Sequence, residues 1–314
     1  MKKKNRYKIA LVLIAVILLT GCTQILQDKN NKAIVNPETG QSLTKNIVCR
    51  PTNKKVIEVY NKQDKNILKD LPSCKDFKVT SGGYEGLWTS LFIKPLAFVI
   101  LFIGNFVSSY GLSIIIISLI IRLIAYPITN KTAMQSELLQ KANPDLKRIE
   151  EKYKDKTDQE SMMKKSTEMT GVYKKYNINP LSGCIYALLQ LPLFIAFLEA
   201  INRVPAIFEE TFLGFQLGTT PWIGLFDKSP IYIILVIITG LSTYFSFKLN
   251  QTAVSNQDGM KNMPGMMVGV FTVMSLFMPS ALVIYWITTN MFTVVQNMIV
   301  KRSKSLNEKK YLHS

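Results

Sequence analysis

The amino-acid sequence predicts an all-α membrane protein with five transmembrane helices, an amphipathic helix at the outer interface and a cytoplasmic helical hairpin. Two compositional observations support this fold class: 48% of the 314 residues are hydrophobic, and the formal net charge is +17. That combination is unusual in a soluble domain and typical of apolar spans joined by basic loops. The third observation is where the basic residues fall relative to the apolar segments, because cytoplasmic loops carry an excess of Lys and Arg.

The N-terminus is typical of a targeting segment. A basic stretch, 1–8, precedes a short apolar run, 9–20, which is too brief for a comfortable membrane span. The run leads into Leu-Thr-Gly-Cys22, which resembles a bacterial lipobox. That resemblance implies a lipoprotein signal peptide, 1–21, cleaved before Cys22, and acylation of the Cys22 thiol with a palmitate-type chain. An uncleaved first helix is the alternative.

The segment 22–85 is polar, is expected to lie outside the cytoplasm, and holds two cysteines. Disulfides persist in that environment, so we expect Cys49 and Cys74 to be bridged; two free thiols in a mobile tail are the alternative. So few apolar side chains build only a small core, which predicts a stapled unit or a tether. The stretch from Val56 to Tyr60 is predicted as one short strand.

Six apolar segments follow, and we expect five of them to cross the membrane. Counted from an external Cys22, six crossings would place 129–180, with 11 Lys plus Arg, and the tail 301–314, with five, outside the cell. Five crossings place both in the cytoplasm, as the positive-inside rule requires. The segment expected not to cross is 86–107, because Lys94-Pro95 and Asn105 interrupt its apolar run. It is predicted as an amphipathic helix in the outer interface.

This count assigns the rest of the chain to loops, a tail and five membrane spans. The loops and tail are a cytoplasmic hairpin at 129–180, an extracytoplasmic loop at 204–229, a cytoplasmic loop at 249–262 and a basic cytoplasmic tail at 301–314. The five predicted spans are 108–128, 181–203, 230–248, 263–279 and 280–300.

The hairpin is predicted from helical periodicity. One helix should continue from Asn130 to about Tyr153 with a kink before Pro144. A second should begin at a capping box, Thr157-x-x-Glu160, and end near Tyr176. The charged residues of the hairpin form either a solvated surface or a binding site for acidic or nascent partners. The residues expected on one face of the second helix are Met162, Met169, Val172, Tyr173 and Tyr176.

No enzyme chemistry is visible in the sequence. The single histidine is His313, near the end of the chain, which excludes Ser–His catalysis and histidine-rich metal sites. There is no phosphate loop and no dinucleotide fingerprint. The sequence therefore predicts a protein that is not an enzyme and needs neither a cofactor nor a metal.

Arg122 is the most informative residue, because it lies within the apolar run of the first predicted span. A cation near the hydrocarbon core is disfavoured by roughly 2.5–3.5 kcal/mol on insertion scales, so it is paired, snorkelled to an interface or turned toward a wet cavity. No acidic residue in the spans is an obvious partner for Arg122, which favours the third alternative, a side chain that faces water in a cavity. Glu199 and Arg203 are four residues apart and are expected to pair with each other.

Three blocks of sequence carry a resemblance to a known family: Tyr110 to Pro127, Tyr173 to Pro192 and Tyr285 to Gln296. Together they resemble the YidC/Oxa family of membrane protein insertases, in its Gram-positive lipoprotein form. They hold, in order, the arginine of the first core span, the exit of the hairpin with the second span, and the last span. The match covers most of the chain from about Trp88 to Val300, whereas the segment 23–85 does not resemble the family.

The resemblance implies that the five spans enclose a hydrophilic groove, open to the cytoplasm and to lipid but closed on the outside. It implies that short-tailed nascent membrane proteins are received by the hairpin and inserted into the lipid bilayer, alone or with the Sec translocon. The site would be the bacterial plasma membrane, with the lipid-anchored N-terminus outside and the C-terminus in the cytoplasm. The substrate-groove residues are expected to be Arg122, Gln190, Trp286, Thr289 and Asn290.

Two rival functions remain open at this stage. A membrane-protein assembly chaperone without insertase activity would suit the methionine-rich fourth span, 263–279, equally well. A small transporter would need paired ion-binding residues, which the sequence does not display. The basic tail is either a contact for ribosomal RNA or a consequence of topology.

Overall fold

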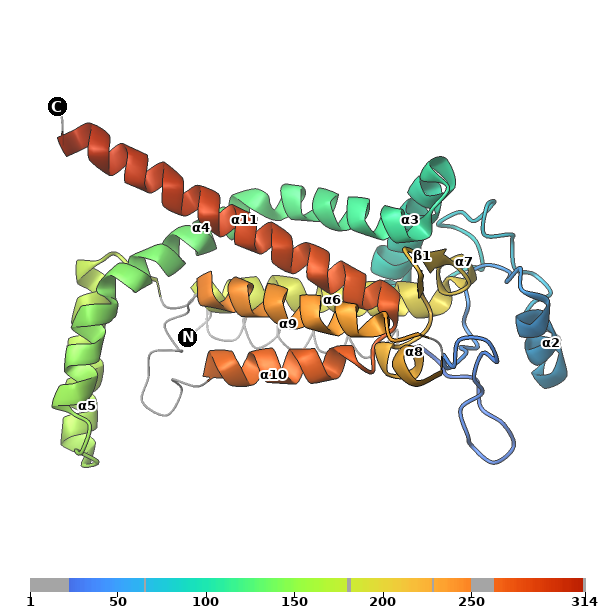
Figure 1. Cartoon of the computed structure of the whole chain (residues 1–314), viewed down its shortest axis with the longest axis horizontal. Helices are drawn as coiled ribbons and strands as arrows, with labels where there is room; N and C mark the ends of the chain where they lie inside the picture. The colour runs from blue at the N-terminus through green and yellow to red at the C-terminus, as the bar shows by residue number, and fades with distance from the viewer. Residues whose placement is uncertain (1–22, 65, 180–181, 228, 250–262, 313–314) are drawn as a thin grey trace. The chain divides into compact units, whose positions relative to one another are not determined.

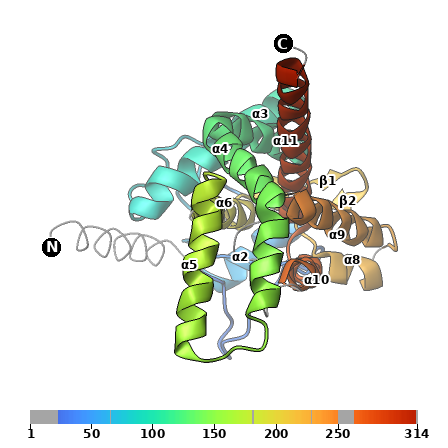
Figure 2. The same cartoon turned by 90° about the vertical axis from the view of Figure 1, so that its left-hand side faces the viewer.

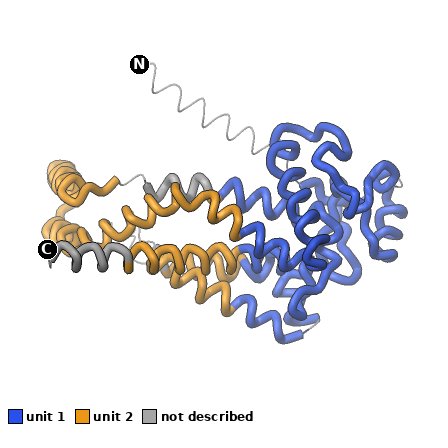
Figure 3. The backbone as a smooth tube through the Cα atoms, turned by 90° about the horizontal axis from the view of Figure 1, so that it is seen from above, with its two compact units in different colours: residues 1–118, 191–236, 275–285 blue, residues 119–190, 237–274, 286–314 orange. Residues whose placement is uncertain are grey.

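The computed structural model describes residues 23–64, 66–179, 182–227, 229–249 and 263–312, which are mostly α-helical (Figure 1). The predicted signal peptide, Cys22 and most of the loop 249–262 lie outside these residues. The chain divides into two compact units (Figure 3). Unit 1 comprises 1–118, 191–236 and 275–285, and unit 2 comprises 119–190, 237–274 and 286–314.

Unit 1 contains the N-terminal segment, the short loop elements and one end of several long helices. Its sheet is a two-stranded antiparallel hairpin whose turn needs Gly214 at φ +85°. Wholly within unit 1 are α2 (Lys54–Gln63), η1 (Thr89–Ile93), α3 (Lys94–Val107), α7 (Pro205–Phe208), β1 (Thr211–Phe212), β2 (Phe215–Gln216) and α8 (Pro221–Asp227).

Four long helices contribute residues to both units. Unit 2 also contains a shorter helix between α4 and α6, and nearly all of another between α9 and α11. The long helices are α4 (Tyr110–Lys152), α6 (Ser182–Arg203), α9 (Tyr232–Leu249) and α11 (Ser280–Leu312). Unit 2 contains α5 (Gln159–Lys175) and all but the last residue of α10 (Met263–Ser275).

Among the described residues, four stretches are helical, long and apolar enough to cross a membrane. The first of them lies in the segment predicted as an amphipathic helix. Lys94-Pro95 interrupts its apolar run but not the helix, since Pro95 lies in the first turn of α3, where a missing N–H is tolerated. Length and composition therefore permit this stretch to cross as well as to lie along the membrane. The four are Thr89–Val107, the apolar part of Tyr110–Lys152, Tyr232–Leu249 and Ser280–Arg302.

Residues 23–85, hereafter the N-terminal lobe, form a small packed body rather than a tether. The predicted strand at 56–60 is wrong, since these residues belong to α2. Asn53 caps this helix by accepting from the backbone N–H of Lys55, and the two side chains it buries, Val56 and Tyr60, are one helical turn apart. Cys49 and Cys74 are joined by a disulfide. The core contains Leu26, Leu43, Ile47, Val56, Tyr60 and Leu68, together with Phe208 of α7.

Helices α4 and α5 lie side by side in unit 2 (Figure 2). Helix α4 is continuous through Pro127 and Pro144. The cap of α5 is Asp158, whose carboxylate accepts from the Ser161 backbone at 2.8 Å, and not the predicted Thr157. Their shared core is Leu139, Ala142, Leu146, Met169 and Ile178, with Val172, Tyr173 and Tyr176 packed against it.

Met162 departs from the expected face of the second helix. It is 53% exposed, because it lies in the first turn of α5, beyond the buried cluster. The other members of the predicted stripe, Met169, Val172, Tyr173 and Tyr176, do pack against α4.

Candidate functional site

The interior of unit 2 is polar along its membrane-type helices. In the stretches 119–136 of α4, 237–249 of α9 and 286–300 of α11, Ala133 and Val300 are the only apolar residues that are buried. The buried polar residues of these stretches are Arg122, Thr129, Thr132, Ser136, Thr239, Ser242, Thr243, Ser246, Thr289, Thr293, Gln296 and Asn297.

The outward face of the same stretches is apolar. This arrangement is the inverse of a water-soluble protein, in which apolar side chains fill the core. A lipid-facing exterior around a polar interior accounts for both faces at once. The exposed large side chains of these stretches include Ile120, Leu123, Ile124, Ile128, Ile237, Leu241, Phe245, Met291, Val295 and Met298.

Arg122 and Gln190 come together in this interior. Arg122 is only 5% exposed although its helix is otherwise apolar at that level. Its Nη2 donates a hydrogen bond of 2.6 Å to Oε1 of Gln190, which is half-buried on α6. A charge-assisted bond of this kind fixes the direction of the guanidinium without neutralising its charge. The guanidinium therefore brings a fixed positive charge into the polar interior of unit 2.

Trp286, Thr289 and Asn290 form a second group, on α11. Trp286 Nε1 and Asn290 Nδ2 both donate to the hydroxyl oxygen of Thr243 on α9, at 3.2 and 2.9 Å. Thr289 is buried and donates its own hydroxyl hydrogen to the Trp286 carbonyl at 3.0 Å. The Trp286 ring stacks on Phe271 of α10 at 4.6 Å between centroids. Three helices of unit 2 therefore meet at this point.

The sequence prediction missed Thr243 and Thr129. Thr129 on α4 exchanges hydrogen bonds with the Gln296 amide on α11, at 2.9 Å for the amide as donor. The available signal was spacing: Thr239, Thr243 and Ser246 recur along one face of α9 within an otherwise apolar run. Hydroxyl residues are common in membrane helices as packing contacts, so the stripe did not stand out.

Two ion pairs connect α5 to α4 away from this interior. Lys152 Nζ lies 2.6 Å from a Glu168 oxygen, and Lys175 Nζ lies 2.9 Å from an Asp145 oxygen. The hydrogen bond from Lys152, and then that from Tyr153, lowers the pKa of the Glu168 carboxyl. Lys175, and then Tyr176, lowers the pKa of Asp145 in the same way. The contacts join the two helices at the middle of α5 and at its C-terminal end.

The sequence resembles one protein family over most of its length. The family model described as 60Kd inner membrane protein matches residues 102–309. The chain is 36% identical over 226 residues to the membrane protein insertase YidC of Oceanobacillus iheyensis, and the aligned region covers 69% of this chain and 85% of that relative. It is 33% identical over 216 residues to the membrane protein insertase MisCA of Bacillus subtilis, which covers 68% and 79%.

A solved structure shows a weaker likeness. It is described as an active YidC insertase crystal structure with the first transmembrane domain resolved, and it is 23% identical to this chain with a TM-score of 0.49. The likeness covers 77% of this chain and 51% of the other.

Proposed function

The chain belongs to the 60Kd inner membrane protein family and is a membrane protein insertase, and on that basis we propose that it moves short-tailed membrane proteins from the cytoplasm through a hydrated groove into the bilayer. An insertase is not an enzyme in the catalytic sense. The observation that carries the groove is the reversed burial of unit 2, with hydroxyl, amide and guanidinium groups inside and aliphatic side chains outside.

The groove would shorten the apolar path that a polar tail must cross. Moving a polar group from water into hydrocarbon costs several kcal/mol of free energy, because nothing there replaces its hydrogen bonds to water. Thr243, Asn290 and Gln296 carry donors and acceptors that can replace those bonds within the membrane. The tail would therefore exchange one set of polar contacts for another.

We propose that Arg122 attracts the acidic tail of the substrate. Its guanidinium is buried and held by Gln190, and a fixed cation within the membrane is screened less than the same charge in bulk water, so it attracts an acidic tail more strongly. The transmembrane segment of the substrate then partitions into lipid, and burial of its apolar surface drives release. This mechanism requires no nucleotide.

The topology we propose has five spans, with the N-terminal lobe outside and the α4–α5 hairpin and basic tail in the cytoplasm. The 11 Lys plus Arg of 129–180 support that side for the hairpin. The stretch Thr89–Val107 would lie in the outer interface, with Val99, Phe102 and Phe106 exposed to the acyl chains. The hairpin would receive nascent chains, which the protein would insert alone or with the Sec translocon. The ribosome is a further candidate partner, through the hairpin and the basic tail.

Neighbouring positions on α11 test the hydrated groove. Asn290 is half-buried in the polar interior, and Met291 is 50% exposed on the apolar face. Maleimides react with the thiolate, which forms readily in water and poorly in lipid. In native membranes, Asn290→Cys should react with a water-soluble maleimide much faster than Met291→Cys. Equal rates, or a faster Met291→Cys, would refute the groove.

A further inference from the structure

We infer that the N-terminal lobe is an external clamp that holds the outer ends of α6 and α11 closed against ion leakage. The lobe lies outside the region that matches the family, which begins at residue 102. The inference rests on the proposed topology, in which the lobe is outside the cell. All of the contacts that support it lie within unit 1.

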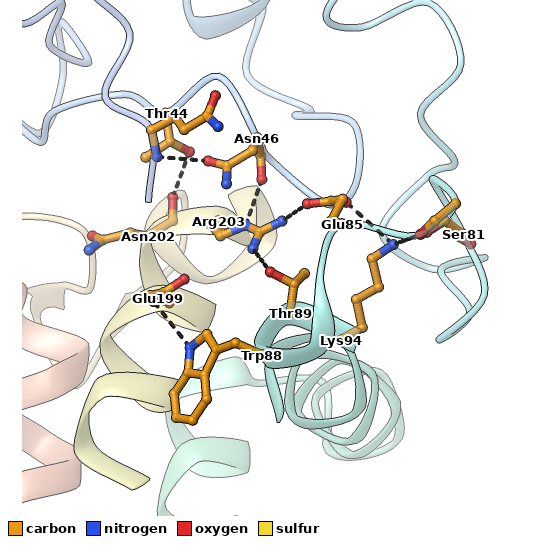
Figure 4. A network of polar contacts seen from close by, with 12 residues as sticks. Thr44, Asn46, Ser81, Glu85, Trp88, Thr89, Lys94, Glu199, Asn202 and Arg203 are labelled. Atoms are coloured by element: carbon orange, nitrogen blue, oxygen red, sulfur yellow. Dashed lines mark hydrogen bonds and ion pairs between the residues drawn. The ribbon is translucent and has the colours of Figure 1, made fainter. Parts of the chain in front are cut away.

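Arg203, the last residue of α6, is the centre of the contact (Figure 4). Its side chain is fully buried, at 0% exposure. Nε donates to the Asn46 carbonyl of the lobe at 2.7 Å, and Nη2 forms an ion pair with Glu85. The expected pairing of Arg203 with Glu199 is therefore wrong; Glu199 instead accepts from Trp88 Nε1 at 3.2 Å.

Glu85 is shared by a second buried cation. Lys94 of α3 is 1% exposed, and its Nζ lies 3.3 Å from a Glu85 oxygen. Lys94 also donates to the Ser81 and Gly83 carbonyls of the lobe, at 2.7 and 2.5 Å. A buried charge whose partner is removed is strongly destabilised. Loss of the Glu85 carboxylate would leave two buried cations facing each other without their shared anion.

The lobe also binds the loop after α6. Glu209 accepts from the backbone N–H of Thr52 and of Asn53, both at 3.1 Å, and from the Thr52 hydroxyl at 2.6 Å. The Gln41 amide donates to the Asn202 side chain at 2.9 Å. The lobe thus holds α6 and its following loop at separate points, which is what a clamp requires.

Thr219 transmits the contact to α11. Its hydroxyl donates to the Thr39 carbonyl of the lobe at 3.0 Å. Its own carbonyl accepts from the Ser280 backbone N–H at 2.8 Å, and Leu217 accepts from the Ala281 N–H at 3.0 Å. Ser280 and Ala281 are the first two residues of α11. One loop therefore joins the lobe to the beginning of α11.

The helix ends held in this way carry buried apolar side chains, hereafter the apolar plug. The rings of Phe197 and Tyr285 stack at 4.1 Å between centroids. Tight apolar packing of this kind leaves no room for water or ions. The plug residues, all no more than 2% exposed, are Ala196, Phe197, Ala200, Ile201, Ala281, Leu282, Val283 and Tyr285.

The disulfide lies beside the clamp contacts. Cys49 follows Val48, whose backbone N–H donates to the Arg203 carbonyl at 2.9 Å. The bond to Cys74 closes a loop of lobe residues that would otherwise gain conformational freedom. Opening this bond should loosen the lobe where it contacts α6.

The test uses the full chain in proteoliposomes with a reporter cysteine at Thr39, which is 3% exposed where the lobe meets the loop. Thr39→Cys should react slowly with an impermeant maleimide. Adding Glu85→Gln, or Cys49→Ser with Cys74→Ser, should raise the labelling rate on the order of tenfold, as expected when a charge-assisted bond or a cross-link is lost. Ion leak should rise in the same variants. Glu58→Gln, an exposed carboxylate on the lobe, is the matched control and should change neither.

Two results would overturn the clamp: labelling that stays slow in both sets of variants, or labelling that rises without any ion leak. Insertion of a test substrate is scored separately in the same vesicles. A wild-type protein that inserts nothing would contradict the proposed function, yet the labelling and leak results would still decide the clamp.

Discussion

At the scale of the residue, Arg122 carries the proposed function because it is a buried cation held in place by an amide. Arg122→Ala should impair the insertion of substrates with acidic N-terminal tails more than the insertion of those with neutral tails. Arg122→Lys should retain more activity than alanine, because attraction needs only a point charge, although lysine loses the fixed geometry of the guanidinium. The measurement is protease protection of two substrates that differ only in the charge of the tail.

The matched control for Arg122 is Lys62→Ala, which removes an exposed cation from α2. It should leave the insertion of both substrates unchanged. Full activity of Arg122→Ala on the acidic substrate would count against charge attraction. It would favour a role for Arg122 in keeping the groove hydrated.

Thr243 gives a prediction on stability. Thr243→Val keeps the volume of the side chain but leaves the donors of Trp286 and Asn290 without their shared acceptor. The free energy of unfolding should fall by roughly 0.5–1.5 kcal/mol, the net contribution of a hydrogen bond, because both donors are only half-buried and water can reach them. The thermal unfolding midpoint in detergent measures it. Thr170→Val, on the exposed face of α5, should leave the midpoint nearly unchanged.

Residue pairings were the hardest part of the site to predict. The spacing of Glu199 and Arg203 predicted a local pair, but Arg203 binds Glu85, which is 118 positions away in the sequence. Helical spacing identifies which residues can meet along one helix, and it says nothing of what packs against the helix. Arg122 could be singled out because a cation in an apolar run is unfavourable whatever its neighbours are.

At the scale of the element, the stability of the packing of α5 against α4 should depend on pH. The pKa of the Glu168 carboxyl lies below its ordinary value of 4.5, and that of Asp145 below 3.8. The unfolded state therefore binds protons at a higher pH than the folded state. The stabilisation is complete above the ordinary values and is lost as the pH falls below them. Hydrogen exchange of the α5 amides, corrected for intrinsic rates, should show lower protection at about pH 3 than at about pH 6.

Glu168→Gln should weaken the pH dependence of α5 protection, because it removes one of the two titrating contacts. Glu151→Gln is the matched control, since Glu151 is exposed on the last turn of α4. Identical pH profiles for Glu168→Gln and the native chain would show that the ion pairs contribute nothing to the packing of the two helices.

The elements differ in how well the sequence could predict them. Long apolar runs and helical periodicity predicted most of the helices of both units, because those signals are local. The N-terminal lobe could not be derived in this way. Val56 and Tyr60 suit a strand by residue type, but Asn53 caps a helix there and the core includes Phe208 from a distant part of the chain.

At the scale of the whole molecule, the sides of the membrane can be tested with two exposed positions. Five crossings place Lys62 of the lobe outside and Lys147 of α4 inside. An impermeant maleimide added to intact cells should therefore label Lys62→Cys and spare Lys147→Cys. If Thr89–Val107 also crossed, the two positions would lie on the same side and would be labelled alike.

The central claim is that this chain inserts membrane proteins and can do so without the Sec translocon. The purified protein is reconstituted alone into liposomes and given a single-span substrate with a short tail, and the substrate is then treated with protease. We expect a protected transmembrane fragment that is absent from empty liposomes and reduced by Arg122→Ala. Substrate that binds the vesicles but remains fully digestible would contradict the claim, and would leave the protein as an assembly chaperone.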